Sequence, residues 1–258
     1  MEFEEYYEIG EECFGNGEYK NALEYFQKCI SINESNDCLN YIGCCYLGLK
    51  DYSPAINVFK NIIRECPYSE RAMLNLGRTY LKQEKLQEAL ECLEKTISIN
   101  SNSEDAYYYQ GVYYEKTDNL EEAMLCYERS LSLNFEQPEA HLNLGTCFYK
   151  KHLYNEAIHE FDLAFKYDNN FIKAKENKGI VYLDMKEYKN ALNEFLLVYK
   201  DNHYNISNII DIAHCYYKIK YFQDAYNWIK KALRIEPGNE YANEYANKMK
   251  KKVNSRIS

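Results

Sequence analysis

Apolar and small residues recur along this chain with the spacing of amphipathic helices, and the pattern as a whole repeats about every 34 residues. The clearest copy is the segment 138–171, where Gly145 and Phe148 mark a first helix and Ala157 and Phe161 a second. A pair of short helices cannot bury its apolar faces alone and must stack on copies of itself. The pattern therefore predicts an all-α solenoid of helical hairpins.

The repeat keeps its register over seven copies. Position 8 is small in every copy: Gly10, Gly43, Gly77, Gly111, Gly145, Gly179 and Ala213. Position 20 is always alanine: Ala22, Ala55, Ala89, Ala123, Ala157, Ala191 and Ala225. Position 24 is large: Phe26, Phe59, Leu93, Tyr127, Phe161, Phe195 and Ile229. Small residues let two helix backbones approach closely, and the large residues fill the space around that contact.

This period, with its Leu-Gly, Tyr, Ala, Phe and Pro positions, resembles the tetratricopeptide repeat. The resemblance covers about residues 3 to 239 and implies a right-handed superhelical solenoid that forms a single domain, 1–258. The repeats are expected at about 3–35, 36–69, 70–103, 104–137, 138–171, 172–205 and 206–239. Residues 240–258 are expected to form a capping helix over the apolar face of the last repeat, with Tyr241, Tyr245 and Met249 along one side. The sequence departs from the family pattern at position 4, which carries no Trp, and at Ala213.

The composition of the chain indicates the cellular compartment in which the protein is expected. The ten cysteines include Cys45, Cys147 and Cys215 at position 10 and Cys92 and Cys126 at position 23, which indicates small apolar packing residues rather than disulfides or a zinc site. Reduced thiols suggest the cytosol, so we expect a cytoplasmic protein. The residues after Met1 are acidic and do not resemble a signal peptide. No apolar stretch approaches the length of a membrane span, and we expect no membrane association.

No catalytic motif is present in the sequence. The five histidines form no H-E-x-x-H motif, and each glycine of the repeat series is explained by helix packing. We therefore expect a protein that is not an enzyme and that needs no cofactor and no metal. The net charge of −9 argues against nucleic acid as a partner. The only tryptophan, Trp228, is interpreted as a packing residue.

Function is then expected on a surface. Positions 2, 5, 6, 9 and 13 of each first helix form a stripe opposite the packing positions, and in the family that this chain resembles the stripe lines a concave groove that holds an extended peptide. The candidate peptide-binding residues are Arg71, Asn75, Arg78, Lys82, Tyr108, Tyr109, Asn143, Lys150, Lys173 and Asn177. Asparagine at position 6 offers both a donor and an acceptor to a peptide backbone. The basic residues favour an acidic segment.

Some alternatives to a peptide-binding adaptor remain open. The family's clamp for chaperone C-termini is broken, because Asn143 and Lys173 match it whereas Tyr108, Val112 and Asn177 do not. Self-assembly through the end repeats is one rival, and an accessory module of an enzyme complex such as a glycosyltransferase is another. Residues 1–36 carry a net charge of −7 and residues 240–258 a net charge of +3, which predicts weak head-to-tail self-association.

Overall fold

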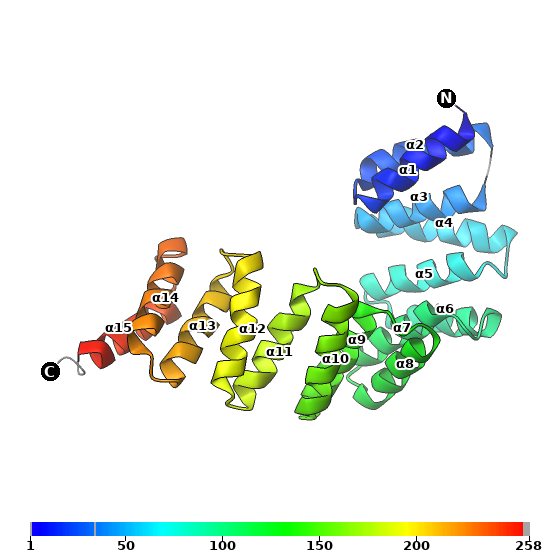
Figure 1. Ribbon diagram of the computed structural model, residues 1–258. Helices are drawn as coiled ribbons and strands as arrows, with labels where there is room; N and C mark the ends of the chain where they lie inside the picture. Colours follow the sequence, from blue (N-terminus) through cyan, green and yellow to red (C-terminus); the bar gives the residue numbers. More distant parts are fainter. Residues whose placement is uncertain (1, 34, 255–258) are drawn as a thin grey trace. The chain divides into compact units, whose positions relative to one another are not determined.

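The computed structural model describes residues 2–33 and 35–254, and this part of the chain consists of fifteen α-helices without a strand (Figure 1). The helices are α1 (Phe3–Gly15), α2 (Tyr19–Ile32), α3 (Asn36–Gly48), α4 (Tyr52–Glu65), α5 (Glu70–Lys82), α6 (Leu86–Ile99), α7 (Glu104–Lys116), α8 (Leu120–Leu133), α9 (Pro138–Lys150), α10 (Tyr154–Tyr167), α11 (Ile172–Asp184), α12 (Tyr188–Asp201), α13 (Ile206–Lys218), α14 (Phe222–Ile235) and α15 (Glu240–Asn254). Each predicted repeat is one hairpin of consecutive helices. The predicted all-α solenoid of hairpins is confirmed.

The turn inside each hairpin follows one design. Its central residue, at position 15 of the repeat, adopts a left-handed backbone conformation. In the first repeat this residue is Gly17, with φ of 76°. In the others it is a non-glycine residue with φ between 58° and 68°: Lys50, Glu84, Asp118, His152, Lys186 and Lys220. After α3, for example, the backbone N–H of Asp51 donates to the carbonyl of Tyr46 at 2.8 Å, and that of Lys50 to Leu47 at 3.0 Å. This is a Schellman ending, and it directs the chain into the second helix.

The two helices of a hairpin meet where the small residue at position 8 faces the large residue at position 24. A Cβ atom added to Gly145 would lie 2.7 Å from Cε1 of Phe161, and one added to Gly179 would lie 2.6 Å from Cε1 of Phe195. At Gly77 the same atom would meet Cβ of Cys92 and the side chain of Leu93, each at 3.3 Å. The glycines are therefore needed where the opposing side chain is an aromatic ring, which confirms the packing role predicted for these positions.

The seventh repeat explains the departure of Ala213 from the family pattern. Ala213 shares a buried cluster with Ile229, which replaces the aromatic ring of position 24, and both residues have no exposed surface. A branched aliphatic side chain leaves room for one methyl group, whereas a ring does not.

The helices form two compact units, Met1–Phe135 with α1 to α8 and Glu136–Ser258 with α9 to α15. In the first unit each helix packs on the next, and the first helices of neighbouring hairpins also touch, α3 with α5 and α5 with α7. In the second unit α9 touches α11 in the same way. These first helices thus lie side by side, which places this part of the predicted stripe on neighbouring helices. A single domain spanning 1–258 stays a prediction.

The capping helix α15 packs on the last hairpin. Ala242, Tyr245 and Met249 are buried, whereas Tyr241 is 54% exposed and stacks on the ring of Tyr245. Tyr241, Tyr245 and Met249 therefore lie along one side of α15, as predicted, with Tyr241 at the exposed edge of the buried face. Residues 255–258, including Arg256 of the basic tail, and Glu34 of the acidic first repeat lie outside the described residues.

The remaining packing predictions also agree with the structure. Trp228 is half-buried, with its ring 4.7 Å from that of Tyr199. The cysteines of positions 10 and 23 are all buried: Cys45, Cys92, Cys126, Cys147 and Cys215. Burial raises the pKa of the Cys45 thiol to about 12 and that of Cys92 to about 11. These thiols are therefore neutral apolar groups near pH 7.

Candidate functional site

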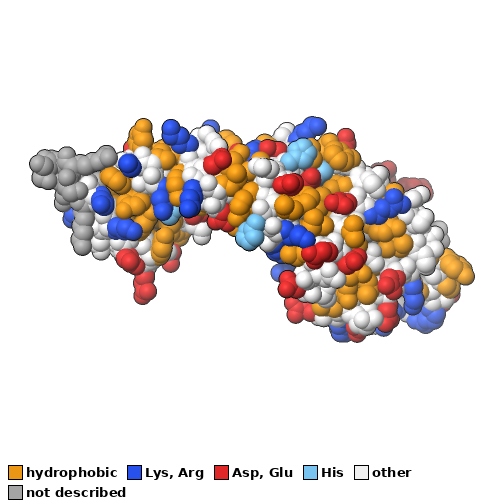
Figure 2. Space-filling view, turned by 90° about the horizontal axis from the view of Figure 1, so that it is seen from below, with side chains coloured by type: hydrophobic (Ala, Val, Ile, Leu, Met, Phe, Trp, Pro, Cys, Tyr) orange, Lys and Arg blue, Asp and Glu red, His pale blue; other side chains and the backbone are white. Residues whose placement is uncertain are grey.

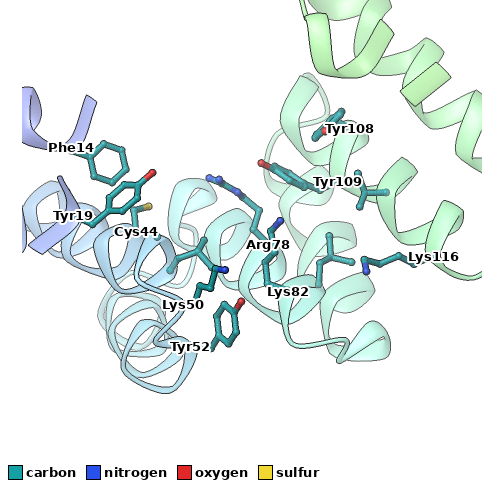
Figure 3. A pocket seen from close by; sticks show the side chains of 14 residues that line it. Phe14, Tyr19, Cys44, Lys50, Tyr52, Arg78, Lys82, Tyr108, Tyr109 and Lys116 are labelled. Carbon is teal, nitrogen blue, oxygen red and sulfur yellow. The ribbon is translucent and has the colours of Figure 1, made fainter. Parts of the chain in front are cut away.

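A basic pocket lies in the first unit, among the first three hairpins and α7, with a cavity volume of about 460 Å³ (Figure 3). Its basic residues are Lys50, Arg78, Lys82 and Lys116, and its aromatic residues are Phe14, Tyr19, Tyr52, Tyr108 and Tyr109. Leucines, Val112, Cys44 and Gly48 complete the lining, which includes no carboxylate. We call this cavity the basic pocket.

Helix periodicity explains how these side chains converge. Arg78 and Lys82 are four residues apart on α5 and so share one helix face. Tyr109 and Lys116, seven residues apart, share a face of α7 in the same way. Because α5 and α7 are in contact, the two faces border the same space. Lys50 reaches the pocket from the left-handed turn that follows α3.

The cations of the basic pocket keep much of their charge available. The Arg78 guanidinium lies over the ring of Tyr109, 5.0 Å from its centre, and donates a hydrogen bond to Oδ1 of Asn75 at 3.1 Å. Lys50, Lys82 and Lys116 are exposed, and no ion pair within the described part of the chain neutralises them. On the molecular face shown in Figure 2, by contrast, basic, acidic and hydrophobic side chains are interspersed.

A second cavity adjoins the first and has a different character. Its volume is about 440 Å³, and it shares Phe14, Cys44 and Arg78 with the basic pocket. The other lining residues are Asn40, Tyr41, Glu70, Arg71, Leu74, Asn75, Ser103, Glu104 and Asp105. We call this cavity the polar pocket. Three carboxylates and two guanidinium groups line it, so the two adjoining pockets differ in charge.

Internal contacts already occupy several polar-pocket groups. Arg71 pairs with Asp37 at 3.3 Å, and Glu70 accepts a hydrogen bond from the Asn100 amide at 2.9 Å. Asn75 is only 4% exposed, and its side-chain oxygen Oδ1 accepts a hydrogen bond from Arg78. Asn75 was expected on the open stripe, and its burial corrects that expectation. The cause is the hydrogen bond with Arg78, together with the close packing of α5 between its neighbours.

The ten predicted binding residues therefore fall into two groups. Arg78, Lys82, Tyr108 and Tyr109 line the basic pocket, and Arg71, Asn75 and Arg78 line the polar pocket. The other four belong to the second unit: Asn143, Lys150, Lys173 and Asn177. In that unit Asn143 and Asn177 are half-buried on the adjacent helices α9 and α11, Lys150 is exposed, and Lys173 pairs with Glu176 at 2.8 Å.

The sequence prediction missed part of the basic pocket. Phe14, Tyr19, Lys50 and Tyr52 line it but lie outside the stripe of positions 2, 5, 6, 9 and 13. Lys50 occupies a turn, while Tyr19 and Tyr52 begin second helices. Tyr19 and Tyr52 could have been predicted from position 17 of the repeat, because aromatic residues recur there in the sequence, next to the turn inside each hairpin.

Buried charges in the second unit serve packing. Nζ of Lys178 lies 2.7 Å from Asp162 and 3.2 Å from Glu194, which joins α10, α11 and α12. Burial acts to lower the pKa of Lys178, but the hydrogen bond with Asp162 and the charge of Glu194 outweigh burial and raise it. Nδ1 of the buried His141 lies 2.6 Å from Glu160. These groups hold neighbouring helices together.

Comparison with known proteins places this helical-repeat scaffold in a family. The family model described as the tetratricopeptide repeat protein 21 C-terminal ARM domain matches residues 21–161, and tetratricopeptide-repeat models match residues 3–36 and 207–239. The chain belongs to the tetratricopeptide-repeat family. Repeats of this family generally mediate contacts between proteins, and the family is generally non-catalytic.

Several curated proteins are similar over part of the chain. The BBSome complex member BBS4 of Xenopus tropicalis is 31% identical over 77 residues, which cover 30% of this chain and 15% of that protein. Heat shock protein STI1 of Saccharomyces cerevisiae is 27% identical over 101 residues, or 38% of this chain and 17% of that protein. The matched segments thus span less than a fifth of these relatives.

Solved structures share the fold at low identity. The APC/C hetero-tetramer Cut9-Hcn1 matches with a TM-score of 0.73 and 17% identity, over 91% of this chain and 46% of that chain. PilF of Pseudomonas aeruginosa matches with a TM-score of 0.72 and 16% identity, over 83% and 97% of the two chains. YrrB, described as having an unusual peptide-binding site, matches with a TM-score of 0.63 and 21% identity, over 72% and 96%.

Two further features bear on partners. Among the helices of the described residues, none combines the length and the apolar character that a membrane span requires. The same residues include no group of three or more histidine, cysteine, aspartate or glutamate side chains placed to hold a metal ion.

Proposed function

We propose that this protein is a non-catalytic adaptor that binds an extended, acidic segment of a partner protein in the basic pocket of its first unit. The observation that carries the proposal is the lining of that pocket, where four cations and five aromatic rings meet without a carboxylate. The BBSome complex member and the APC/C hetero-tetramer found among the similar proteins both belong to multiprotein assemblies by their names, which supports an adaptor role.

The chemistry of the pocket suits a chain that carries both carboxylates and an apolar anchor. Charge-assisted hydrogen bonds from lysine and arginine to carboxylates contribute about 1.5–3 kcal/mol each. The walls formed by Tyr19, Tyr52 and Tyr109 can pack against apolar side chains of the same segment. A lining of one sign also disfavours basic segments, because they would place like charges together.

We propose that the second unit offers backbone contacts of its own, independently of the basic pocket. Asn143 and Asn177 occupy position 6 on the neighbouring helices α9 and α11 and are half-buried. An amide at this place pairs with a peptide backbone whatever the side chains of the segment are. Each such contact is expected to contribute about 0.5–1.5 kcal/mol. The pairing of Lys173 with Glu176 reduces the positive charge beside Asn177, so we assign the main electrostatic recognition to the first unit.

The absence of nucleic acid partners and a cytoplasmic location belong to this proposal as well. The net charge of −9 disfavours a polyanion such as nucleic acid as a general ligand. The ten cysteines are all free, and most are buried, which suits a reducing compartment.

An array of immobilised acidic peptides tests the proposal. Peptides of about eight residues, which extend over roughly 25 Å, combine glutamate or aspartate with one aromatic residue at varied positions. We expect the parent protein to bind some of them and the Lys82→Glu variant to bind at least tenfold less well. Lys95→Glu is the matched control, because Lys95 is an exposed lysine of α6 outside both pockets. Equal binding by the parent and Lys82→Glu would place the functional surface elsewhere.

A further inference from the structure

One residue that lines the polar pocket has a buried side-chain oxygen for which the described part of the chain supplies no hydrogen-bond donor. Asn40, on α3, is 5% exposed and lines this pocket. Its amide nitrogen donates to the carbonyl of Asn36 at 2.9 Å, which fixes the orientation of the amide, since the opposite assignment would face two oxygens. Its Oδ1 atom is buried and, among the described residues, accepts no hydrogen bond. A buried carbonyl without a donor is unfavourable by about 1–3 kcal/mol, so this atom favours a ligand that donates an N–H group.

The surrounding charges favour a cationic donor. Glu104 and Asp105, in the first turn of α7, and Glu70, in the first turn of α5, line the same pocket. Carboxylates in a first turn also stabilise their own helix through its dipole, but this effect does not account for the acceptor on Asn40. Of the two guanidinium groups in the lining, Arg71 pairs with Asp37, and Arg78 lies over Tyr109 toward the basic pocket.

We infer that the polar pocket is a subsite for a lysine or arginine side chain of the same partner segment whose acidic residues occupy the basic pocket. The two pockets adjoin through Phe14, Cys44 and Arg78, so a continuous chain can occupy both. The inference rests on the proposed function and sharpens it. The partner segment carries a cation beside its acidic stretch, and a uniformly acidic segment leaves the acceptor of Asn40 unpaired.

Paired synthetic peptides measure the contribution of the cation. Each fluorescein-labelled probe has a Glu-Glu-Phe sequence, a spacer of up to about four serines, roughly 13 Å when extended, and a final lysine. Its twin carries acetyl-lysine, which has nearly the same shape without the charge. Fluorescence anisotropy gives the dissociation constant of each. For at least one spacer we expect the lysine peptide to bind the parent protein about tenfold more tightly than its twin.

Variants of the polar pocket test whether the preference for the lysine peptide arises in this pocket. Asn40→Leu and Asp105→Asn should each reduce the ratio between the twins to about threefold or less, since each removes an acceptor or a charge. Asp118→Asn is the matched control, because Asp118 lies beyond the C-terminal end of α7 and outside both pockets, and it should keep the parent's ratio. Circular dichroism verifies folding. If the buried Asn40→Leu variant fails to fold, the exposed Asp105→Asn variant decides the question.

The outcomes separate the two proposals. A ratio near one for every spacer, with binding still sensitive to Lys82→Glu, overturns the cation subsite and leaves the acidic-segment proposal standing. A lysine preference that survives both Asn40→Leu and Asp105→Asn overturns the assignment to the polar pocket. Failure of every probe to bind at about 1 mM, a limit near −4 kcal/mol, contradicts both proposals.

Discussion

Replacing Gly179 by alanine tests the packing rule of the repeat. Gly179 lies on α11 opposite Phe195 of α12, and Phe195 has no exposed surface. The Cβ atom of the new alanine would lie 2.6 Å from Cε1 and 2.9 Å from Cδ1 of the ring, whereas ordinary contacts begin at 3.4 Å. The ring must therefore move by more than half an ångström inside a closely packed cluster.

Two effects of opposite sign decide the result. Overpacking of this kind costs typically about 1–3 kcal/mol, and alanine in place of glycine gains about 1 kcal/mol of helix propensity. We expect a net loss of about 0–2 kcal/mol in the free energy of unfolding of the parent protein. In a Phe195→Ile background, which copies the natural pair of Ala213 and Ile229, the same Gly179→Ala change should stabilise by up to about 1 kcal/mol. The coupling between the two sites should then be about 1–3 kcal/mol.

Urea unfolding followed by Trp228 fluorescence measures this coupling. Trp228 packs against the cluster that contains Phe195, so its signal reports on the part of the second unit in question. Ala213→Gly is the reciprocal control and should destabilise by about 1 kcal/mol, because the space beside Ile229 already accepts a methyl group. If Gly179→Ala stabilised the parent as much as it stabilises the Phe195→Ile variant, the packing rule would be wrong.

Three further predictions concern the turns, one carboxyl group and the ends of the chain. Asp118→Gly should raise the melting temperature, because a left-handed backbone conformation is unfavourable by about 1–2 kcal/mol for a residue other than glycine. For the same reason Gly17→Ala should lower the melting temperature, and calorimetry measures the sign of both changes. Burial, followed by the charge of Glu176, raises the pKa of Asp211 from 3.8 to about 6, so its contribution to stability is full below about pH 4 and is lost as the pH rises through 6. Urea midpoints of the Asp211→Asn variant should lack that pH slope, whereas Asp201→Asn should retain it. Sedimentation at several concentrations should show weak self-association that salt abolishes, and a dimer that persists in about 0.5 M salt would contradict its electrostatic origin.

The fold could be predicted because its information is local and repeated. A ring at position 24 requires a small residue at position 8, and this pairing recurs with one period, so helix boundaries and partners follow from the register. Even the departure at Ala213 has a counterpart in the sequence, since Ile229 replaces the ring.

The site could be predicted only in part, because it also depends on contacts between repeats. Arg78, Lys82, Tyr108 and Tyr109 were predicted as binding residues and line the basic pocket, since a helix face fixes their direction, and peptide binding by them stays a prediction. Lys50 was missed because its direction depends on a left-handed turn rather than on helix periodicity. The burial of the Asn40 amide could not be predicted from the sequence either, because it results from the packing of side chains from several helices.

A charge-swap experiment tests the central claim most directly. An acidic probe selected on the array is measured by anisotropy against the parent protein, Lys82→Glu and Lys95→Glu, together with a second probe in which one glutamate is replaced by lysine. The account predicts that Lys82→Glu weakens the acidic probe at least tenfold and that the lysine-bearing probe regains most of this loss on Lys82→Glu alone. Equal affinities of the parent and Lys82→Glu for both probes would contradict recognition of an acidic segment in the basic pocket.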